Sequence, residues 1–314
     1  MPHFILLIPL LLGIHFPIAS YAEQVRPQRA LHLTTPERAS VIAATLAKDR
    51  IVAVGDHGII LLSDDGKTFR QARSVPSRAT LTSVYFIDGK SGWAAGHDDT
   101  ILMTTDGGES WRLQRQAPGQ DKVWLSLLFY SPRHGLAVGQ FGLLLETHDG
   151  GATWQERQLA QNESNPRHLM HIFPGKDQLF IASEAGALYR SEDGGRNWRQ
   201  IQTECRGSFW TGLALDDGGI IVAGMRGNIY RSDDRGTSWK KVPSGTQQSI
   251  TAIAQRSDGL LRLVGTGGTT LFSRDRGRSF SSSVRQDRTD LTTLVSTRHG
   301  DVLFDHKGVV KNEH

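Results

Sequence analysis

Short apolar segments of four to seven residues recur along the chain, separated by clusters of Gly, Asp and Ser. A representative unit contains four such segments, at residues 81–87, 92–96, 101–105 and 111–114. Short alternating runs bounded by turn-forming residues are typical of antiparallel strands joined by tight turns. No segment has helical periodicity outside the first 22 residues. The pattern therefore predicts an all-β protein.

A recurring phrase sets the period of the pattern. Six times, a Ser or Thr is followed by Asp, Gly, a small polar residue and Trp or Phe, at residues 63–69, 104–111, 147–154, 191–198, 232–239 and 273–280. The closing aromatic residues are 42, 43, 44, 41 and 41 positions apart. Four antiparallel strands in each repeat of about 40 residues are the signature of a β-propeller blade. We predict a seven-bladed β-propeller, with six or eight blades as the alternatives.

The phrase itself has a structural role in this interpretation. It lies between the third and fourth strands, where an Asp carboxylate accepts backbone N–H groups and a glycine supplies a positive φ. The closing aromatic residue is expected to pack between blades. The structural positions are Asp65, Asp106, Trp111, Asp149, Trp154, Asp193, Trp198, Asp234, Trp239, Asp275 and Phe280.

The repeat also divides the chain. We expect units near residues 40–72, 81–116, 122–159, 167–203, 208–243, 249–284 and 291–314, all within one propeller domain that covers residues 23–314. The last unit ends without the phrase or a fourth strand, and residues 29–34 form an unassigned alternating segment. We therefore predict that residues 29–34 complete the seventh blade as its outer strand, which would remove an exposed sheet edge.

The N-terminal segment has the features of an export signal. Residues 4–18 are apolar, and Ser20, Tyr21 and Ala22 offer small residues near a cleavage point. We expect residues 1–22 to be a cleaved signal peptide, which would send the chain to the periplasm or outside the cell, without a membrane span in the mature chain. Cys205 is the only cysteine, so no disulfide within the chain is possible.

The charge is mildly basic, with a formal net charge of +4. Between Arg226 and Arg288 there are ten Arg and two Lys against five acidic residues. The planar guanidinium group of arginine is suited to binding carboxylates and phosphates. A solvated surface with salt bridges explains the same composition. Export and the modest net charge argue against a nucleic-acid partner.

Residues 138–154 read Val-Gly-Gln-Phe-Gly-Leu-Leu-Leu-Glu-Thr-His-Asp-Gly-Gly-Ala-Thr-Trp, and the phrase is the Asp-box of BNR-repeat propellers. This form resembles the photosystem II stability and assembly factor family over residues 30–314. The resemblance implies a seven-bladed, lumenal or periplasmic scaffold that assists assembly of the photosystem II reaction centre without catalysis. It further implies a protein client, a membrane-complex subunit, and no cofactor. The chain departs from photosynthetic members in lacking a lipid-attachment cysteine and a twin-Arg pair in the signal.

Residues that differ between repeats point to the binding face. In propellers, the loops between the second and third strands lie opposite the Asp-box turns, and their side chains ring the mouth of the central channel. The binding hypothesis names, from these loops, His57, His97, Phe141, Glu184, Met225, Arg226, His306 and Lys307, together with Arg256 from the basic segment.

Two other functions remain open at this point. A sialidase-like hydrolase or carbohydrate-binding protein would need a Tyr–Glu pair, with Tyr85 and Tyr130 as the tyrosines not repeated between blades. The Asp–His pairs in the loops at 56–57, 97–99 and 305–307 suit a transition metal by residue type, although polar contacts or solvation explain them equally. We expect neither a catalytic nor a metal site.

Overall fold

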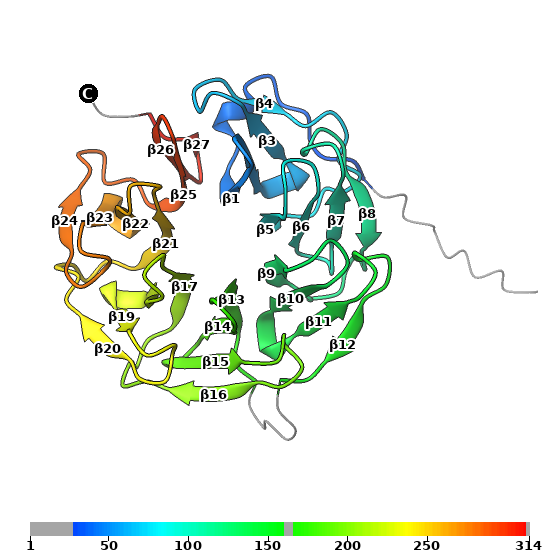
Figure 1. Cartoon of the computed structure of the whole chain (residues 1–314). Coiled ribbons are helices and arrows are strands. Elements are labelled where there is room, and N and C mark those ends of the chain that lie inside the picture. The colour runs from blue at the N-terminus through cyan, green and yellow to red at the C-terminus, as the bar shows by residue number, and fades with distance from the viewer. Residues whose placement is uncertain (1–27, 160–165, 312–314) are drawn as a thin grey trace, which may run out of the picture.

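The computed structural model describes residues 28–159 and 166–311, and within them the prediction of an all-β, seven-bladed propeller is confirmed. Seven small antiparallel sheets surround a central axis (Figure 1). The proposed signal peptide at residues 1–22 lies outside the described residues. No helix in the described ranges has the length and apolar character of a membrane span.

Each of the first six blades contains four strands in chain order from the axis outward. The first three blades are β1 (Val41–Ala47), β2 (Arg50–Gly55), β3 (Ile60–Ser63) and β4 (Arg70–Gln71); β5 (Leu81–Phe86), β6 (Gly92–Gly96), β7 (Ile101–Thr104) and β8 (Arg112–Arg115); and β9 (Trp124–Phe129), β10 (Gly135–Gly139), β11 (Leu144–Thr147) and β12 (Gln155–Arg157). The second strands are buried almost throughout, because neighbouring blades cover both of their faces.

The remaining blades repeat this layout. They are β13 (Leu169–Pro174), β14 (Leu179–Ser183), β15 (Ala187–Ser191) and β16 (Arg199–Gln202); β17 (Phe209–Ala214), β18 (Ile220–Gly224), β19 (Ile229–Ser232) and β20 (Lys240–Val242); β21 (Ile250–Gln255), β22 (Leu261–Gly265), β23 (Thr269–Ser273) and β24 (Ser281–Val284); and β25 (Leu291–Thr297), β26 (Gly300–Asp305) and β27 (Gly308–Val309). Short 3-10 turns complete the structure: η1 (Pro36–Arg38), η2 (Asp56–Gly58), η3 (Gln140–Gly142), η4 (Met225–Gly227) and η5 (Thr266–Gly268).

The Asp-box turns connect the third and fourth strands. In the third blade, Asp149 Oδ1 accepts the amide of Thr153 at 2.8 Å, and its Oδ2 accepts the Thr153 hydroxyl at 2.6 Å. The Thr147 hydroxyl donates to Asp149 and accepts the amide of Gly151 at 2.8 Å. The hydrogen bonds from Thr153 lower the pKa of Asp149 to about 2, because they stabilise its charged form. The turn is therefore closed by side chains that lie within the phrase itself.

The structure of the last blade contradicts the predicted ring closure. Its sheet has three strands, and residues 29–34 do not pair with β27. Their backbone is bound to the first blade instead: Ala30 N–H donates to the Val75 carbonyl and Leu31 N–H to the His57 carbonyl, both at 3.1 Å. These donors are consequently not available to the seventh sheet. The prediction of a shared outer strand was wrong.

Side chains close the ring where no strand is shared. Leu31 and Leu33 pack on an apolar cluster drawn from the first and seventh blades. Within that cluster, Phe69 meets Phe304 edge to face with ring centroids 5.9 Å apart. The Thr292 hydroxyl donates to the Val41 carbonyl across the junction at 2.7 Å. A further hydrogen bond joins Ser40 Oγ and His306 Nδ1 at 3.4 Å. The ends of the ring are thus joined by burial of apolar surface and by inter-blade hydrogen bonds.

Candidate functional site

The turns between second and third strands lie together on one face, which we call the loop face. The tips of these turns have a positive φ in successive blades, including His57 (57°), Phe141 (51°) and Arg226 (57°). Glycine follows each of these three tips, and a Cβ on Gly227 would lie 2.2 Å from the Thr246 carbonyl oxygen in the link to the next blade. Crowding against the link therefore fixes the turn and leaves the tip side chain exposed to solvent.

The structure brings eight of the nine proposed binding residues to this face, because all eight belong to these turns. His57, His97, Phe141, Arg226, His306 and Lys307 are exposed, whereas Glu184 and Met225 are partly buried. Phe141 is 64% exposed, and its ring lies edge-on to His168 at 4.6 Å. The amide of His168 in turn donates to Glu184 at 2.8 Å, so Glu184 helps to hold this aromatic pair in place.

Arg256 is the exception and lies on the opposite face. It occupies the connection between β21 and β22, where it makes an ion pair with Asp258 at 3.5 Å. In an up-and-down blade this connection is on the same side as the Asp-box turns, which we call the box face. Arg256 therefore does not lie with the eight loop-face residues, since composition does not reveal the side of the ring on which a residue lies.

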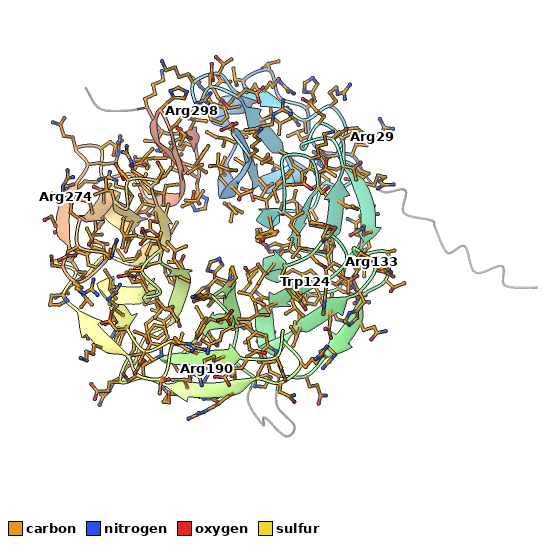
Figure 2. All side chains as sticks on the ribbon, in the orientation of Figure 1. Arg29, Trp124, Arg133, Arg190, Arg274 and Arg298 are labelled. Carbon is orange, nitrogen blue, oxygen red and sulfur yellow. The ribbon has the colours of Figure 1, made fainter. Side chains whose placement is uncertain are left out.

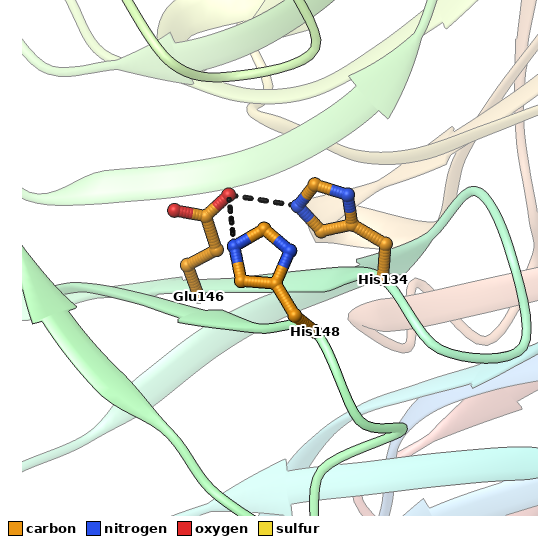
Figure 3. A group of neighbouring side chains, drawn as sticks. All are labelled: His134, Glu146 and His148. Carbon is orange, nitrogen blue, oxygen red and sulfur yellow. Dashed lines mark hydrogen bonds and ion pairs between the residues drawn. The ribbon is translucent and has the colours of Figure 1, made fainter.

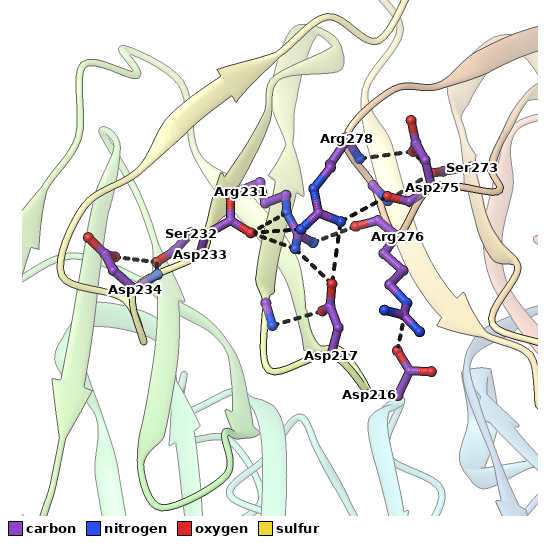
Figure 4. Close-up of polar contacts among 12 residues, drawn as sticks. Asp216, Asp217, Arg231, Ser232, Asp233, Asp234, Ser273, Asp275, Arg276 and Arg278 are labelled. Atoms are coloured by element: carbon purple, nitrogen blue, oxygen red, sulfur yellow. Dashed lines mark hydrogen bonds and ion pairs between the residues drawn. The ribbon is translucent and has the colours of Figure 1, made fainter.

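Other arginines of the basic segment, residues 226–288, also form ion pairs on the box face. Figure 4 shows Arg231 between Asp217 and Asp233, with its Nη2 at 3.0 Å and 2.7 Å from their carboxylates. The exposed Arg278 reaches the same two acids from the next blade, at 3.5 Å and 3.4 Å. These arginines bind acidic groups of this chain and so join neighbouring blades.

Basic side chains on the loop face have a different environment. Within the described parts of the chain, the exposed side chains of Arg78, Arg206, Arg226, Arg288 and Lys307 have no acidic group within ion-pair distance. They lie on the turn tips or on the links between blades. The loop face therefore offers positive charge that the fold does not use.

The central channel opens at the loop face. Side chains fill the blades and the spaces between them, while the centre of the ring remains open, with a cavity of about 360 Å³ (Figure 2). Every innermost strand has a β-bulge at its second residue, beside the residue that ends the second strand: a glycine in five blades, Ser183 in the fourth and Asp305 in the seventh. A bulge redirects its extra residue. The bulged residues all line the channel: Ile42, Thr82, Leu125, Met170, Trp210, Thr251 and Thr292.

Six of the seven bulged residues fall into two groups, and the seventh is the apolar, partly exposed Ile42 of the first blade. The three threonines join neighbouring blades, since the hydroxyls of Thr82, Thr251 and Thr292 donate to backbone carbonyls of the next blade around the ring. In the consecutive third, fourth and fifth blades the position is apolar and partly exposed. We call Leu125, Met170 and Trp210 the apolar arc. The sequence analysis missed these residues, although aligning the second position of each first strand would have distinguished them from the threonines.

His171 follows the apolar arc on the channel wall. Its Nδ1 accepts the amide of Gly212 at 3.1 Å, and its ring stacks on Phe173. Burial lowers the pKa of His171 to about 4, because it disfavours the charged imidazolium. The channel wall is therefore uncharged at this position at neutral pH.

The Asp–His pairs of the loops do not form a cluster of metal-ligand atoms. Asp56 accepts the Thr80 hydroxyl at 3.1 Å, and Asp305 accepts the Lys307 amide at 2.6 Å. Asp99 is bound to Arg115 and Trp124. In the described residues, the group of three or more metal-ligand atoms that does converge lies on the box face.

The two non-repeated tyrosines lie in surroundings that favour their neutral form. Tyr130 lies beside the box face, where its hydroxyl donates to the Gly194 carbonyl at 3.0 Å. Burial and the negative charge of Glu146 raise the pKa of Tyr130, and burial alone raises that of Tyr85. A raised pKa favours the neutral phenol, whereas a nucleophile needs the activated form.

Sequence comparison covers the middle of the chain. A family model described as photosynthesis system II assembly factor YCF48 matches residues 113–261. The photosystem II assembly protein Ycf48 of Thermosynechococcus vestitus is 36% identical over 138 residues, which are 44% of this chain and 39% of that protein. The photosystem II assembly lipoprotein Ycf48 of Trichormus variabilis is 39% identical over 128 residues, 40% of this chain and 37% of that protein. The matched part thus spans about two fifths of these relatives.

Structure comparison covers most of the chain and agrees with the sequence matches. A solved structure of YCF48 bound to D1 peptide superposes with a TM-score of 0.71 at 20% identity, covering 89% of this chain and 97% of that one. YCF48 from Cyanidioschyzon merolae gives a TM-score of 0.68 at 15% identity, covering 90% and 97%. At these identities the likeness shows the shared propeller fold. The chain is thus similar in sequence to photosystem II assembly factors over its middle part, and it shares the propeller fold with solved YCF48 structures over most of its length.

Proposed function

We propose that this protein is an exported, non-enzymatic propeller that binds a client protein during assembly of a membrane complex. The observation that supports this most directly is the apolar arc at the channel mouth, beside basic side chains without acidic partners. Apolar anchors surrounded by polar groups are characteristic of binding hot spots, and unpaired charges steer partners of opposite sign.

The client segment would be extended and would carry both apolar and acidic side chains. Trp210 and Met170 would receive its apolar groups at the channel mouth, and Phe141 would extend that surface outward over the third blade. Arg226 and Arg206 would meet its carboxylates at the rim. His57, His97, His306 and Lys307 remain proposed as polar contacts farther around the ring, in the seventh, first and second blades.

The nature of the client follows from the relatives. A solved YCF48 is bound to a peptide of D1, and the curated relatives are named as photosystem II assembly proteins. We extend this type of client to the present chain as a membrane-complex subunit, which would be a photosystem II reaction-centre protein in a photosynthetic organism. Residues 1–22 would export the chain to the periplasm or the thylakoid lumen.

Capture from native membranes followed by mass spectrometry tests the proposal. The chain should enrich subunits of one membrane complex, and Trp210→Ala should reduce the yield at least fivefold. Arg226→Glu should reduce it at low salt and have less effect at high salt, because exposed charge pairs are screened. No enrichment of any membrane-complex subunit, or enrichment that is unaffected by Trp210→Ala and Arg226→Glu, would refute the binding face.

Arg235→Glu is the matched control for Arg226→Glu. Both arginines are exposed, both belong to the fifth blade, and both have a positive φ, of 57° and 60°. Arg235 lies in the Asp-box turn on the box face. A loss of capture confined to Arg226→Glu would locate the client on the loop face, whereas equal losses would indicate a general charge effect and contradict the proposal.

The hydrolase alternative has a direct assay. With the pKa values of Tyr85 and Tyr130 raised, we propose that the protein does not cleave glycosides. The chain should release no fluorophore from a fluorogenic sialoside above the rate of a boiled sample. Activity that is lost in Tyr130→Phe or Tyr85→Phe would overturn the non-enzymatic assignment.

A further inference from the structure

Two histidines and one glutamate converge on the box face at the junction of the third and fourth blades. His134 Nε2 lies 2.7 Å from Glu146 Oε1, and His148 Nε2 lies 3.3 Å from the same oxygen (Figure 3). The ligand atoms of all three residues lie within 4.8 Å of one another. This cluster lies outside the proposed client site, and the Asp-box does not require its residue types.

Strand register explains why these residues meet. β10 and β11 pair with Gly135 opposite Thr147 and Leu136 opposite Glu146, so continuing the register places His134 opposite His148. Directly opposed residues share a sheet face, and so do residues two positions apart on one strand. His134, Glu146 and His148 therefore project on the same side, toward the fourth blade.

The cluster combines a buried carboxylate with accessible imidazoles. The Glu146 side chain is 3% exposed, that of His134 is 21% and that of His148 is 61%. Arg157 makes an ion pair with the other carboxylate oxygen, Oε2, and also donates to the Arg196 carbonyl of the fourth blade. Oε1 thus faces the two Nε2 atoms, while Arg157 fixes the orientation of the carboxylate.

We infer that His134, Glu146 and His148 form a binding site for a divalent transition-metal ion such as Zn²⁺. Imidazole nitrogen and carboxylate oxygen are established Zn²⁺ ligands, with bonds of about 2.0–2.2 Å. In a tetrahedron with such bonds, ligand atoms lie about 3.3 Å apart. The His148–Glu146 separation already has this value, and the His134–Glu146 separation requires an increase of about 0.6 Å.

The ion would occupy a three-ligand site with one coordination position left for water. It would replace the contacts between the imidazoles and Oε1, and Arg157 would remain on Oε2 as the residue that positions the carboxylate. Tyr130 packs its ring against His134 at 4.4 Å and donates its hydroxyl to the Gly194 carbonyl of the fourth blade. Metal binding would therefore stiffen the junction between the third and fourth blades, in a role separate from client binding.

Metal titration of the chelator-treated full chain tests the inference. Zn²⁺ should bind with one equivalent and a micromolar Kd by calorimetry, and Co²⁺ should give the visible absorption of a tetrahedral site. His148→Gln should weaken binding at least tenfold, and because His148 is largely exposed this variant should retain the fold. The double variant His57→Gln/His306→Gln, which changes two loop-face histidines, should bind the metal as the parent chain does.

Arg157 provides a readout that distinguishes a metal site from an ion-pair network. Arg157→Gln removes the positive charge that opposes a nearby cation but keeps a side-chain amide that can donate to Oε2, so the variant should tighten Zn²⁺ binding severalfold while lowering stability in the absence of metal. Absence of binding up to about 1 mM Zn²⁺ and Co²⁺ would overturn the inference. Binding that persists unchanged in His134→Gln/His148→Gln would also overturn it.

Discussion

The carboxylate of Asp99 accepts the indole N–H of Trp124 at 2.8 Å and so joins the second blade to the third. Asp99 has a φ of 55° in the turn between the second and third strands. Five other blades have glycine at this position of the turn. Its Oδ1 also lies 2.7 Å from Arg115 Nε, and its side chain is 3% exposed. A residue in an unfavourable backbone conformation is thus held by one buried and one partly buried hydrogen bond.

Removing this carboxylate should destabilise the protein. Asp99→Ala leaves the indole N–H of Trp124 and the Arg115 guanidinium without their acceptor, so the free energy of unfolding should fall by about 2–3 kcal/mol. Urea denaturation measures the change, with the exposed Asp121→Ala as the control. If both variants unfolded at the same urea concentration, the Asp99 contacts would contribute no net stability.

Arg231 and Arg278 bind the same two aspartates but differ in burial, with side chains 4% and 54% exposed. Arg231→Ala leaves Asp217 and Asp233 without their closest cation, and should cost about 3 kcal/mol. Arg278→Ala should cost less than about 1 kcal/mol, because exposed ion pairs contribute little. Thermal unfolding of the two variants checks the order, and an equal effect would contradict the importance of burial.

His171 should make stability depend on pH between about 4 and 6.5. Its pKa is about 4 in the folded protein and about 6.5 when unfolded. The unfolded state therefore binds more protons in this interval, and stability falls as the pH decreases. At pH 5 the loss attributable to His171 should be about 2 kcal/mol relative to pH 7.

The comparison with His171→Asn isolates this effect from the other histidines. In urea denaturation the variant should lose about 2 kcal/mol less than the parent chain between pH 7 and pH 5. Parallel pH profiles for the two proteins would show that His171 is protonated equally in the folded and unfolded states.

The Asp-box carboxylates should make stability depend on pH in a lower range than His171 does. The amide and side chain of Asn197 lower the pKa of Asp193 to about 2, so the stability it provides is present above about pH 4 and is lost as the pH falls toward 2. Asp193→Ala should cost about 1 kcal/mol at pH 7, since solvent screens this exposed turn. The variant should approach the parent chain in stability near pH 2, with Asp177→Ala as an exposed control in the same blade.

The seventh blade should open before the others. Its sheet has three strands and shares none with the N-terminal segment, so fewer backbone hydrogen bonds hold it in the ring. Amides of β26 should exchange with solvent at least tenfold faster than amides of β14, the equivalent strand of the fourth blade. Equal protection in both strands would show that side-chain packing at Phe69 and Phe304 is sufficient to close the ring.

The sequence by itself determined the features that depend on local chemistry. The Asp-box is closed by hydrogen bonds within a few residues, and strand alternation has a period of two, so both can be recognised without knowledge of distant contacts. Their recurrence predicted the all-β, seven-bladed architecture. The turns between second and third strands differ in residue type from blade to blade, and this difference indicated the loop face as the binding face. Eight of the nine proposed binding residues lie there.

Only the tertiary structure decided the features that join distant segments. Residues 29–34 have a strand-like pattern, but their amides bond to the first blade rather than to β27. Arg256 belongs to a basic segment, but its connection lies on the box face. The apolar arc and the His134–Glu146–His148 cluster depend on bulges and register, which set the direction of each side chain. Hydrogen-bond partners and side-chain directions are set between strands, and for that reason the sequence pattern alone did not specify them.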